Sequence, residues 1–231
     1  MPVSPAASAE ITAFNWVPPF AKGLVRDLRV RWACEEIGLP YRVRLLDART
    51  AKPAGYVKEQ PFEQVPCFRD GALQLFESGA ILLHLGEHDE RLLPREAVAR
   101  SRATAWLISA LNSVEPAIQN LASIDLFYAN EEWAKLRRPG AVEFAQLKLS
   151  RVSAWLGERE WLEDRFTVGD LMMVTVLRNL RHTDLLSGFP NLVALQARAE
   201  ARPAFQAALA AQLADFVEQE NPEEVRSGCQ K

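Results

Sequence analysis

The sequence has few cysteines, no long apolar run and almost no excess charge, and each of these absences excludes a class of protein. Its 231 residues include three widely spaced cysteines, Cys34, Cys67 and Cys229, so neither a disulfide framework nor a zinc or other metal site is predicted. No segment approaches the roughly 20 apolar residues that cross a bilayer, so no membrane contact is expected. The net charge of −3 gives no general attraction for nucleic acid.

The amino-terminal residues and the cysteines together predict a cytoplasmic protein. Residues 1–10 have neither the basic nor the apolar segment of a signal peptide, and isolated thiols are typical of a reducing compartment. Hydrophobic residues at 48% and charged residues at 25% are typical of globular chains, so a folded chain is expected. Only the ends are expected to differ, with a disordered segment at residues 1–9 and a flexible tail at residues 221–231. The solvated face of a helix is expected to carry Arg26, Arg29 and Arg31.

The first half of the chain mixes strand and helix patterns. Strands are expected at residues 10–15, 41–46, 66–69 and 72–75. Apolar residues at helical spacing predict a helix over residues 24–37, which would make the first two strands parallel. Asp70-Gly71 predicts a hairpin between the last two strands, and a further helix is expected to begin near Glu77. We therefore expect an α/β domain with a four-stranded mixed sheet over residues 10–88.

The second half is predicted to be helical throughout. A polar, proline-ended segment at residues 89–95 is expected to be a linker, and an all-α domain is expected over residues 96–220. Its helices are expected at residues 95–122, 131–157, 167–182, 190–201 and 203–219. Thr167 and Asp170 have the spacing of a capping box. The apolar residues that follow cover every face of their helix, so we expect it to be the buried axis of the second domain.

Two short motifs carry the chemistry. If the Val65-Pro66 bond is cis, the Val65 backbone would face outward and could pair with an extended peptide; the alternative is an ordinary proline at a strand start. Glu77 and Ser78 begin a helix, where free amides and the positive end of the helix dipole favour a carboxylate. The alternative there is plain helix capping.

In this order the features resemble those of the soluble glutathione S-transferase family, from about Ile11 to Phe216. The matching stretches run from Leu28 to Tyr41, Gln60 to Pro66, Glu77 to Ile81, Phe166 to Asp170 and Ala201 to Phe205. The resemblance implies a thioredoxin-like amino-terminal domain that binds glutathione, an all-helical bundle as carboxy-terminal domain, and a homodimer. It also implies a detoxification reaction in which the glutathione thiol attacks a small, partly apolar electrophile.

The resemblance also assigns roles to residues. Val65 would pair with the cysteinyl part of glutathione, Pro66 would be cis, and Glu77 and Ser78 would hold the γ-glutamyl amine and carboxylate. Further contacts with the tripeptide are implied for Gln64, Lys52, Arg26 and Lys22. An acceptor pocket is expected to be lined by Trp106, Ala110, Leu111 and Ser113. Contacts between subunits are expected at Phe62 and along residues 95–122.

The chain departs from its family in the loop that should activate the thiol. Activation requires a hydrogen-bond donor or a positive charge beside the sulfur, and residues 15–26 contain no tyrosine, serine or cysteine. We predict that Asn15 supplies the donor, followed in rank by Arg26, Lys22 and Trp16; a backbone N–H at the helix start is the further alternative. Two other functions stay open: glutathione-dependent peroxidase, thiol reductase or isomerase chemistry, and non-catalytic binding of glutathione or another ligand.

Overall fold

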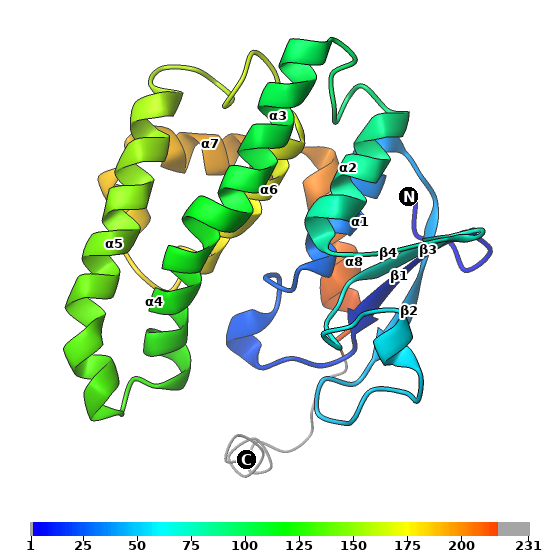
Figure 1. Cartoon of the computed structure of the whole chain (residues 1–231), viewed down its shortest axis with the longest axis horizontal. Coiled ribbons are helices and arrows are strands. Elements are labelled where there is room, and N and C mark those ends of the chain that lie inside the picture. The colour runs from blue at the N-terminus through cyan, green and yellow to red at the C-terminus, as the bar shows by residue number, and fades with distance from the viewer. Residues whose placement is uncertain (1, 217–231) are drawn as a thin grey trace. The chain divides into compact units, whose positions relative to one another are not determined.

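The computed structural model describes residues 2–216, and its first half is built on a four-stranded mixed sheet (Figure 1). The strands are β1 (Ala9–Phe14), β2 (Tyr41–Leu46), β3 (Cys67–Asp70) and β4 (Leu73–Phe76). They lie in the order β2-β1-β3-β4, with β1 parallel to β2 and antiparallel to β3, and with β3 antiparallel to β4. The predicted thioredoxin-like sheet is therefore confirmed.

Two glycines end the elements that the sequence predicted. The crossover helix α1 (Asp27–Ile37) joins β1 to β2 and stops at Gly38, whose φ of +71° is left-handed and whose N–H donates to the carbonyls of Cys34 and Glu35. In the hairpin, Asp70 pairs with Leu73, and Gly71 takes the positive φ of +57° that the two-residue turn needs.

The arginines of α1 are not on a solvated face, and that expectation was wrong. Arg29 and Arg31 are 2% and 0% exposed, and every residue of α1 from Asp27 to Cys34 is buried. Arg31 pairs with Asp27 at 2.7 Å and with Asp215 at 2.5 Å. Burial raises the pKa of Asp27, against the lowering effect of Arg31.

The same buried charges hold the last helix, α8 (Pro203–Ala214), beside α1. The Gln212 side-chain amide donates to Asp27 Oδ1 at 2.7 Å and to the Val25 carbonyl at 3.1 Å. A helix pattern read from α1 alone cannot show this cover, because its partners lie near the other end of the chain.

Of residues 1–9, which were expected to be disordered, the structure describes those from Pro2 onward, and Ala9 already begins β1. The Tyr41 N–H donates to the Pro2 carbonyl and the Ser4 N–H donates to the Tyr41 carbonyl, both at 2.8 Å, so this segment extends the pairing at the edge of β2. The predicted tail at residues 221–231, which includes Cys229, lies outside the described residues.

By their contacts, the described residues form two units, one of residues 2–81 with 207–216 and the other of residues 82–206. Helix α2 (Ser78–His88) and helix α8 each run from one unit into the other. The segment expected to be a linker, residues 89–95, falls within the second unit. There Leu92 is fully buried and its carbonyl accepts from the Val168 N–H at 2.9 Å.

The second unit is helical, as predicted. Its helices are α3 (Ala97–Ser109), α4 (Glu115–Phe127), α5 (Glu132–Leu156), α6 (Val168–Leu177) and α7 (Pro190–Glu200). The helix expected over residues 95–122 is α3 and α4, joined by a wider π-helical turn at Ala110–Val114. Pro116 follows this turn and has no N–H for an α-helical bond to Asn112, so the regular ladder cannot continue through it.

Helix α6 is the predicted buried axis: all ten of its residues are buried. Its amino terminus forms the predicted capping box, in which the Thr167 N–H donates to Asp170 Oδ2 at 3.0 Å and Thr167 Oγ1 accepts from the Gly169 N–H at 3.2 Å. Asp170 Oδ1 also accepts from the Leu162 N–H at 2.8 Å. Helix α6 packs against α3 so closely that the approach requires Gly169.

A Gly169→Ala substitution should destabilise the second unit. A Cβ there would lie 2.7 Å from the Trp106 Cβ and 3.2 Å from the Ala103 carbonyl oxygen, so α3 and α6 would have to separate. Overpacking of this kind costs about 1–3 kcal/mol of unfolding free energy, which chemical denaturation would measure. Gly188→Ala is the matched control, because no described atom lies within 4 Å of its Cβ position. Equal effects of the two substitutions would contradict the close approach.

An Asp170→Asn substitution should lower stability and remove a pH dependence. The new amide cannot accept both sets of bonds that the carboxylate accepts from Leu162 and Thr167, a loss of about 1–3 kcal/mol. Burial raises the pKa of Asp170 from 3.8 to about 6, so between these values the folded chain holds a proton that the unfolded chain has released. In the wild type this group therefore makes the unfolding free energy fall as pH rises through that window. Urea unfolding at several pH values should show that slope reduced in the variant; an unchanged slope would contradict the assignment.

Candidate functional site

The segment before β3 presents an unpaired stretch of main chain. The Val65–Pro66 peptide bond is cis. The Val65 side chain is buried in an apolar cluster with Leu46, Tyr56 and Cys67. Among the described residues, none forms a backbone hydrogen bond with the Val65 N–H or C=O. Val65 is thus fixed by its side chain, while its main-chain donor and acceptor stay available to an extended ligand.

The start of α2 combines a strained residue with a buried one. Glu77 has a φ of +67°, which L-residues rarely adopt, and its carbonyl accepts from the Ile81 N–H at 3.0 Å to begin the helix. Its side chain is exposed, whereas Ser78 is buried. Strain that persists at an exposed residue is typical of functional sites.

A buried guanidinium lies beside this helix start. Arg29 Nη1 donates to Ser78 Oγ at 3.2 Å, and the Arg29 side chain is enclosed. The amino terminus of α2, the serine hydroxyl and Arg29 therefore concentrate positive potential around Ser78. This is the environment that a carboxylate requires, and the exposed Glu77 carboxylate next to it can receive an ammonium group.

Asn15 stands at the end of β1, where the loop of residues 15–26 begins. Its N–H donates to the Leu46 carbonyl at 3.0 Å, which continues the β1–β2 pairing by one residue. Its side-chain Oδ1 is buried and finds no hydrogen-bond partner among the described residues. An unsatisfied buried amide atom is costly, so this position points to a group that is absent from the protein itself.

The other predicted residues of this loop are placed differently. The Trp16 ring lies 5.2 Å from the Arg49 guanidinium carbon, and Lys22 Nζ lies 5.9 Å from the Phe216 ring centre. Arg26 is half-buried at the N-cap of α1. Trp16 and Lys22 thus contact other side chains of the same unit.

The remaining predicted glutathione contacts are Lys52 and Gln64. Lys52 Nζ donates to the Asp47 carbonyl at 3.1 Å and lies 5.1 Å from the Phe14 ring centre. Gln64 has an exposed side chain next to Val65, and its carbonyl accepts from the Tyr56 hydroxyl at 2.7 Å. Gln64 is therefore placed beside the Val65 main chain, whereas Lys52 is bound to its own loop.

The four residues expected to form an acceptor pocket lie on α3 and on the π-helical turn that follows it. Trp106 lines a hollow of about 340 Å³ with Arg102, Ala105, Ser109, Trp155 and Glu163. Its indole N–H donates to Glu163 Oε1 at 2.9 Å. Ala110 is fully buried, Leu111 is half-buried and Ser113 is exposed on the π-helical turn.

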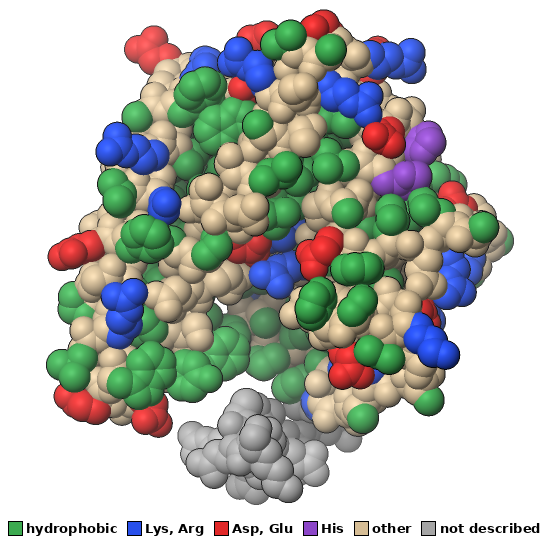
Figure 2. Space-filling model, in the orientation of Figure 1, with side chains coloured by type: hydrophobic (Ala, Val, Ile, Leu, Met, Phe, Trp, Pro, Cys, Tyr) green, Lys and Arg blue, Asp and Glu red, His purple; other side chains and the backbone are tan. Residues whose placement is uncertain are grey.

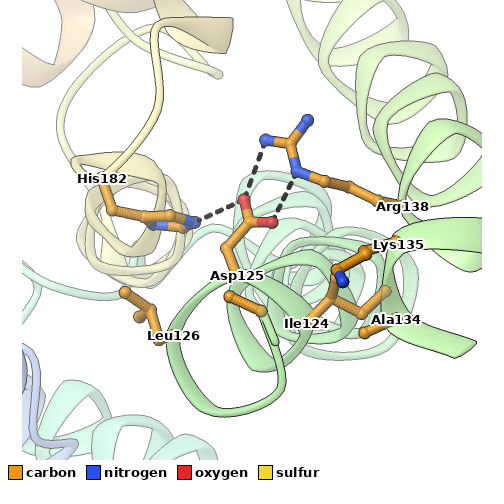
Figure 3. Close-up of a pocket in the computed structure, with 8 residues that line it drawn as sticks. Ile124, Asp125, Leu126, Ala134, Lys135, Arg138 and His182 are labelled. Atoms are coloured by element: carbon orange, nitrogen blue, oxygen red, sulfur yellow. Dashed lines mark hydrogen bonds and ion pairs between the residues drawn. The ribbon is translucent and has the colours of Figure 1, made fainter. Parts of the chain in front are cut away.

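A further pocket of about 450 Å³ in the second unit is lined by Asp125, Arg138 and His182 among other residues (Figure 3). Arg138 binds both carboxylate oxygens of Asp125, at 2.7 and 3.1 Å, and His182 Nε2 lies 3.4 Å from Oδ2. His182 Nδ1 lies 3.0 Å from the Asn179 carbonyl. These groups pair with one another and join the end of α4 to α5 and to the segment after α6, so we interpret the cluster as a structural link.

No group of three or more His, Cys, Asp or Glu side chains among the described residues is arranged to hold a metal ion. No helix in that part of the chain combines the length and the apolar character that a membrane crossing needs.

Three residues of the site escaped prediction. Arg29 was expected on a solvated face, and Thr12 and Tyr56, which contact each other at 3.0 Å beneath the Val65 segment, were not singled out. The cover by α8 that buries α1 has no signal in the α1 sequence. Tyr56 lies in a stretch without strand or helix periodicity, and it is the one aromatic residue between residues 48 and 61.

Comparison with known proteins identifies relatives that are named glutathione S-transferases. Residues 10–87 match the family model described as the glutathione S-transferase N-terminal domain. The chain is 27% identical to glutathione S-transferase GST-4.5 of Xanthomonas campestris over 85% of this chain and 97% of that protein. It is 34% identical to the glutathione S-transferase-like protein OpS6 of Beauveria bassiana over 39% of this chain and 44% of that one.

A solved structure supports the same relationship. The fold matches a glutathione transferase family member from Pseudomonas fluorescens, a crystal structure with two glutathione bound, at a TM-score of 0.79 and 25% identity. The match covers 90% of this chain and 95% of the other.

Proposed function

Because the chain belongs to the glutathione S-transferase family, we propose that it binds glutathione in its amino-terminal unit and activates the thiol for attack on a small, partly apolar electrophile. The observation that carries this proposal is the unpaired Val65 main chain in the same unit as the Glu77–Ser78 helix start. A γ-glutamyl-cysteinyl-glycine peptide offers a main chain for Val65, a carboxylate for Ser78 and an ammonium group for Glu77.

Asn15 is our first candidate for the group that contacts the sulfur. Rotation of its side-chain amide by 180° exchanges Oδ1 and Nδ2, so the buried position can present an N–H donor. A donor to the thiolate stabilises the charged form and lowers the thiol pKa. Arg26 at the start of α1 is the second candidate, since a nearby cation acts in the same direction. Lys22 and Trp16 are the third and fourth candidates; Lys22 Nζ lies 5.9 Å from the Phe216 ring centre, and the Trp16 ring lies 5.2 Å from the Arg49 guanidinium carbon.

A second candidate function is reduction of a disulfide by two glutathione molecules. It is favoured by the missing tyrosine, serine and cysteine in residues 15–26 and by the similar Pseudomonas fluorescens structure with two glutathione bound. One thiolate attacks a disulfide sulfur and releases a thiolate; the second attacks the mixed disulfide, which yields glutathione disulfide and a second thiol. Cys34 and Cys67 are not nucleophiles here, because burial raises the pKa of both thiols.

We also propose a cytoplasmic homodimer. Phe62 is 65% exposed, lies 6.5 Å from the Phe76 ring and is well suited to contact a partner. Exposed hydrophobic side chains also occur over the helical unit (Figure 2), including Val98 and Ile108 on α3. The buried free thiols Cys34 and Cys67 are consistent with a reducing compartment.

Calorimetric titration with reduced glutathione should show that affinity depends on Glu77 and not on the closely matched Glu63. Glu63 and Glu77 are both exposed and both have positive φ, 54° and 67°, so Glu→Gly relieves backbone strain at either position. Glu77→Gly should weaken glutathione binding by about ten- to a hundredfold, because a charge-assisted bond to the ammonium group is lost. Ser78→Ala should also weaken it, whereas Glu63→Gly should not. A wild type that binds no glutathione would refute the proposed function.

Ultraviolet titration of the bound thiolate should show which group activates it. We expect the bound thiol to titrate below the usual value of about 8.5, and Asn15→Ala to return it toward that value, since the donor is removed. Arg26→Ala serves as the comparison, and a larger effect there would make Arg26 the activating group. If the pKa of the bound thiol is not lowered in the wild type, this loop does not activate the thiol. Formation of glutathione disulfide from a disulfide substrate, with two glutathione molecules bound per chain, would favour the second candidate function.

A further inference from the structure

Two buried hydroxyl groups hold the main chain on either side of Val65–Pro66. The Tyr56 hydroxyl donates to the Gln64 carbonyl at 2.7 Å, and the Cys67 N–H donates to Thr12 Oγ1 at 2.6 Å. The two hydroxyl oxygens lie 3.0 Å apart. Both side chains are 1% exposed, so no solvent competes for these bonds.

The direction of each bond in this network follows from proton counting. Tyr56 has one hydroxyl hydrogen, and it is directed at the Gln64 carbonyl. Thr12 must therefore donate its own hydrogen to the Tyr56 oxygen, while its lone pair accepts from the Cys67 N–H. The result is one directed chain from the Cys67 N–H through Thr12 and Tyr56 to the Gln64 carbonyl. Each hydroxyl donates once and accepts once, an arrangement in which neighbouring bonds strengthen one another.

This chain of hydroxyls closes a ring around Val65 and Pro66, the residues proposed to pair with glutathione. Its two main-chain anchors belong to residues 64 and 67, and Val65 and Pro66 lie between them. Thr12 comes from the interior of the sheet in β1, and Tyr56 comes from the 3₁₀ turn Tyr56–Lys58. The neighbouring main-chain groups are thereby occupied, while the donor and acceptor of Val65 are left for a ligand.

We propose that Tyr56 and Thr12 are positioning residues, whose hydroxyl groups fix the Val65 main chain in the orientation that pairs with the cysteinyl part of glutathione. This inference rests on the glutathione site proposed above and deepens it. The Tyr56 ring has a separate role, since it packs with Leu46, Val65 and Cys67 in the apolar cluster. Removal of the hydroxyl alone therefore tests positioning while the packing is kept.

The test compares variants that lose one hydroxyl with variants that keep it. Tyr56→Phe and Thr12→Val each remove a member of the chain at nearly constant volume, and Thr12→Ser keeps the hydroxyl. Tyr41→Phe is the matched control, because Tyr41 is also fully buried but its hydroxyl contacts neither Gln64 nor Thr12. Titration calorimetry with reduced glutathione should show about tenfold weaker binding for Tyr56→Phe and Thr12→Val, the effect of one hydrogen bond. Thr12→Ser and Tyr41→Phe should bind as the wild type does.

Amide hydrogen exchange at Val65 tests positioning directly, because hydroxyl groups with only a structural role would not affect the protection of this N–H by bound glutathione. At saturating glutathione the wild-type Val65 N–H should be protected, and Tyr56→Phe should lose much of that protection even when every molecule is liganded. The double variant should bind no more weakly than either single variant, because both substitutions break the same chain.

The outcomes separate this inference from the function on which it rests. If Tyr56→Phe and Thr12→Val unfold more readily yet keep wild-type affinity and Val65 protection, the hydroxyls are structural and the inference is refuted. If the wild type itself binds no glutathione, the proposed function is refuted and the inference falls with it. Weaker binding by both variants, with Thr12→Ser and Tyr41→Phe unaffected, supports both.

Discussion

The burial of α1 is the constraint on which the amino-terminal unit depends. A helix enclosed over two turns must supply partners for every charge that it carries, because an unpaired buried charge is far too costly. Arg31 therefore needs Asp27 and Asp215, and Gln212 completes the bonds of Asp27. Arg29, enclosed by the same packing, is directed to Ser78. One requirement thus both attaches α8 to the sheet domain and places positive charge at the start of α2.

The candidate site contains hydrogen-bonding groups for which the described residues supply no partner. Next to it, the Gln64 carbonyl and the Cys67 N–H are paired with the hydroxyls of Tyr56 and Thr12. The Val65 main chain and the buried Asn15 amide oxygen stand out against this background. Under the proposed function these are the groups to which glutathione would supply the missing hydrogen-bond partners.

Local sequence signals predicted most of the fold, and distant contacts account for what they missed. The strands, the Asp70-Gly71 hairpin and the Thr167–Asp170 capping box depend on neighbouring residues, and they were visible in the sequence. The burial of Arg31, by contrast, depends on Asp215, which is 184 residues away. The Thr12–Tyr56 contact joins residues 44 positions apart, one of them in a segment with no periodic pattern. Motifs located Val65, Glu77 and Ser78, whereas the residues that support them emerged only from the fold.

The attachment of residues 207–216 to the first unit has a consequence for how the protein is made. On the ribosome the sheet, α1 and the start of α2 leave the exit tunnel long before Gln212 and Asp215 are synthesised. Until then Arg31 and Asp27 have only each other, and one side of α1 lacks its cover. The domain that is translated first can therefore reach its final structure only after residues 207–216 have been synthesised, and the helical domain has the opportunity to fold before it.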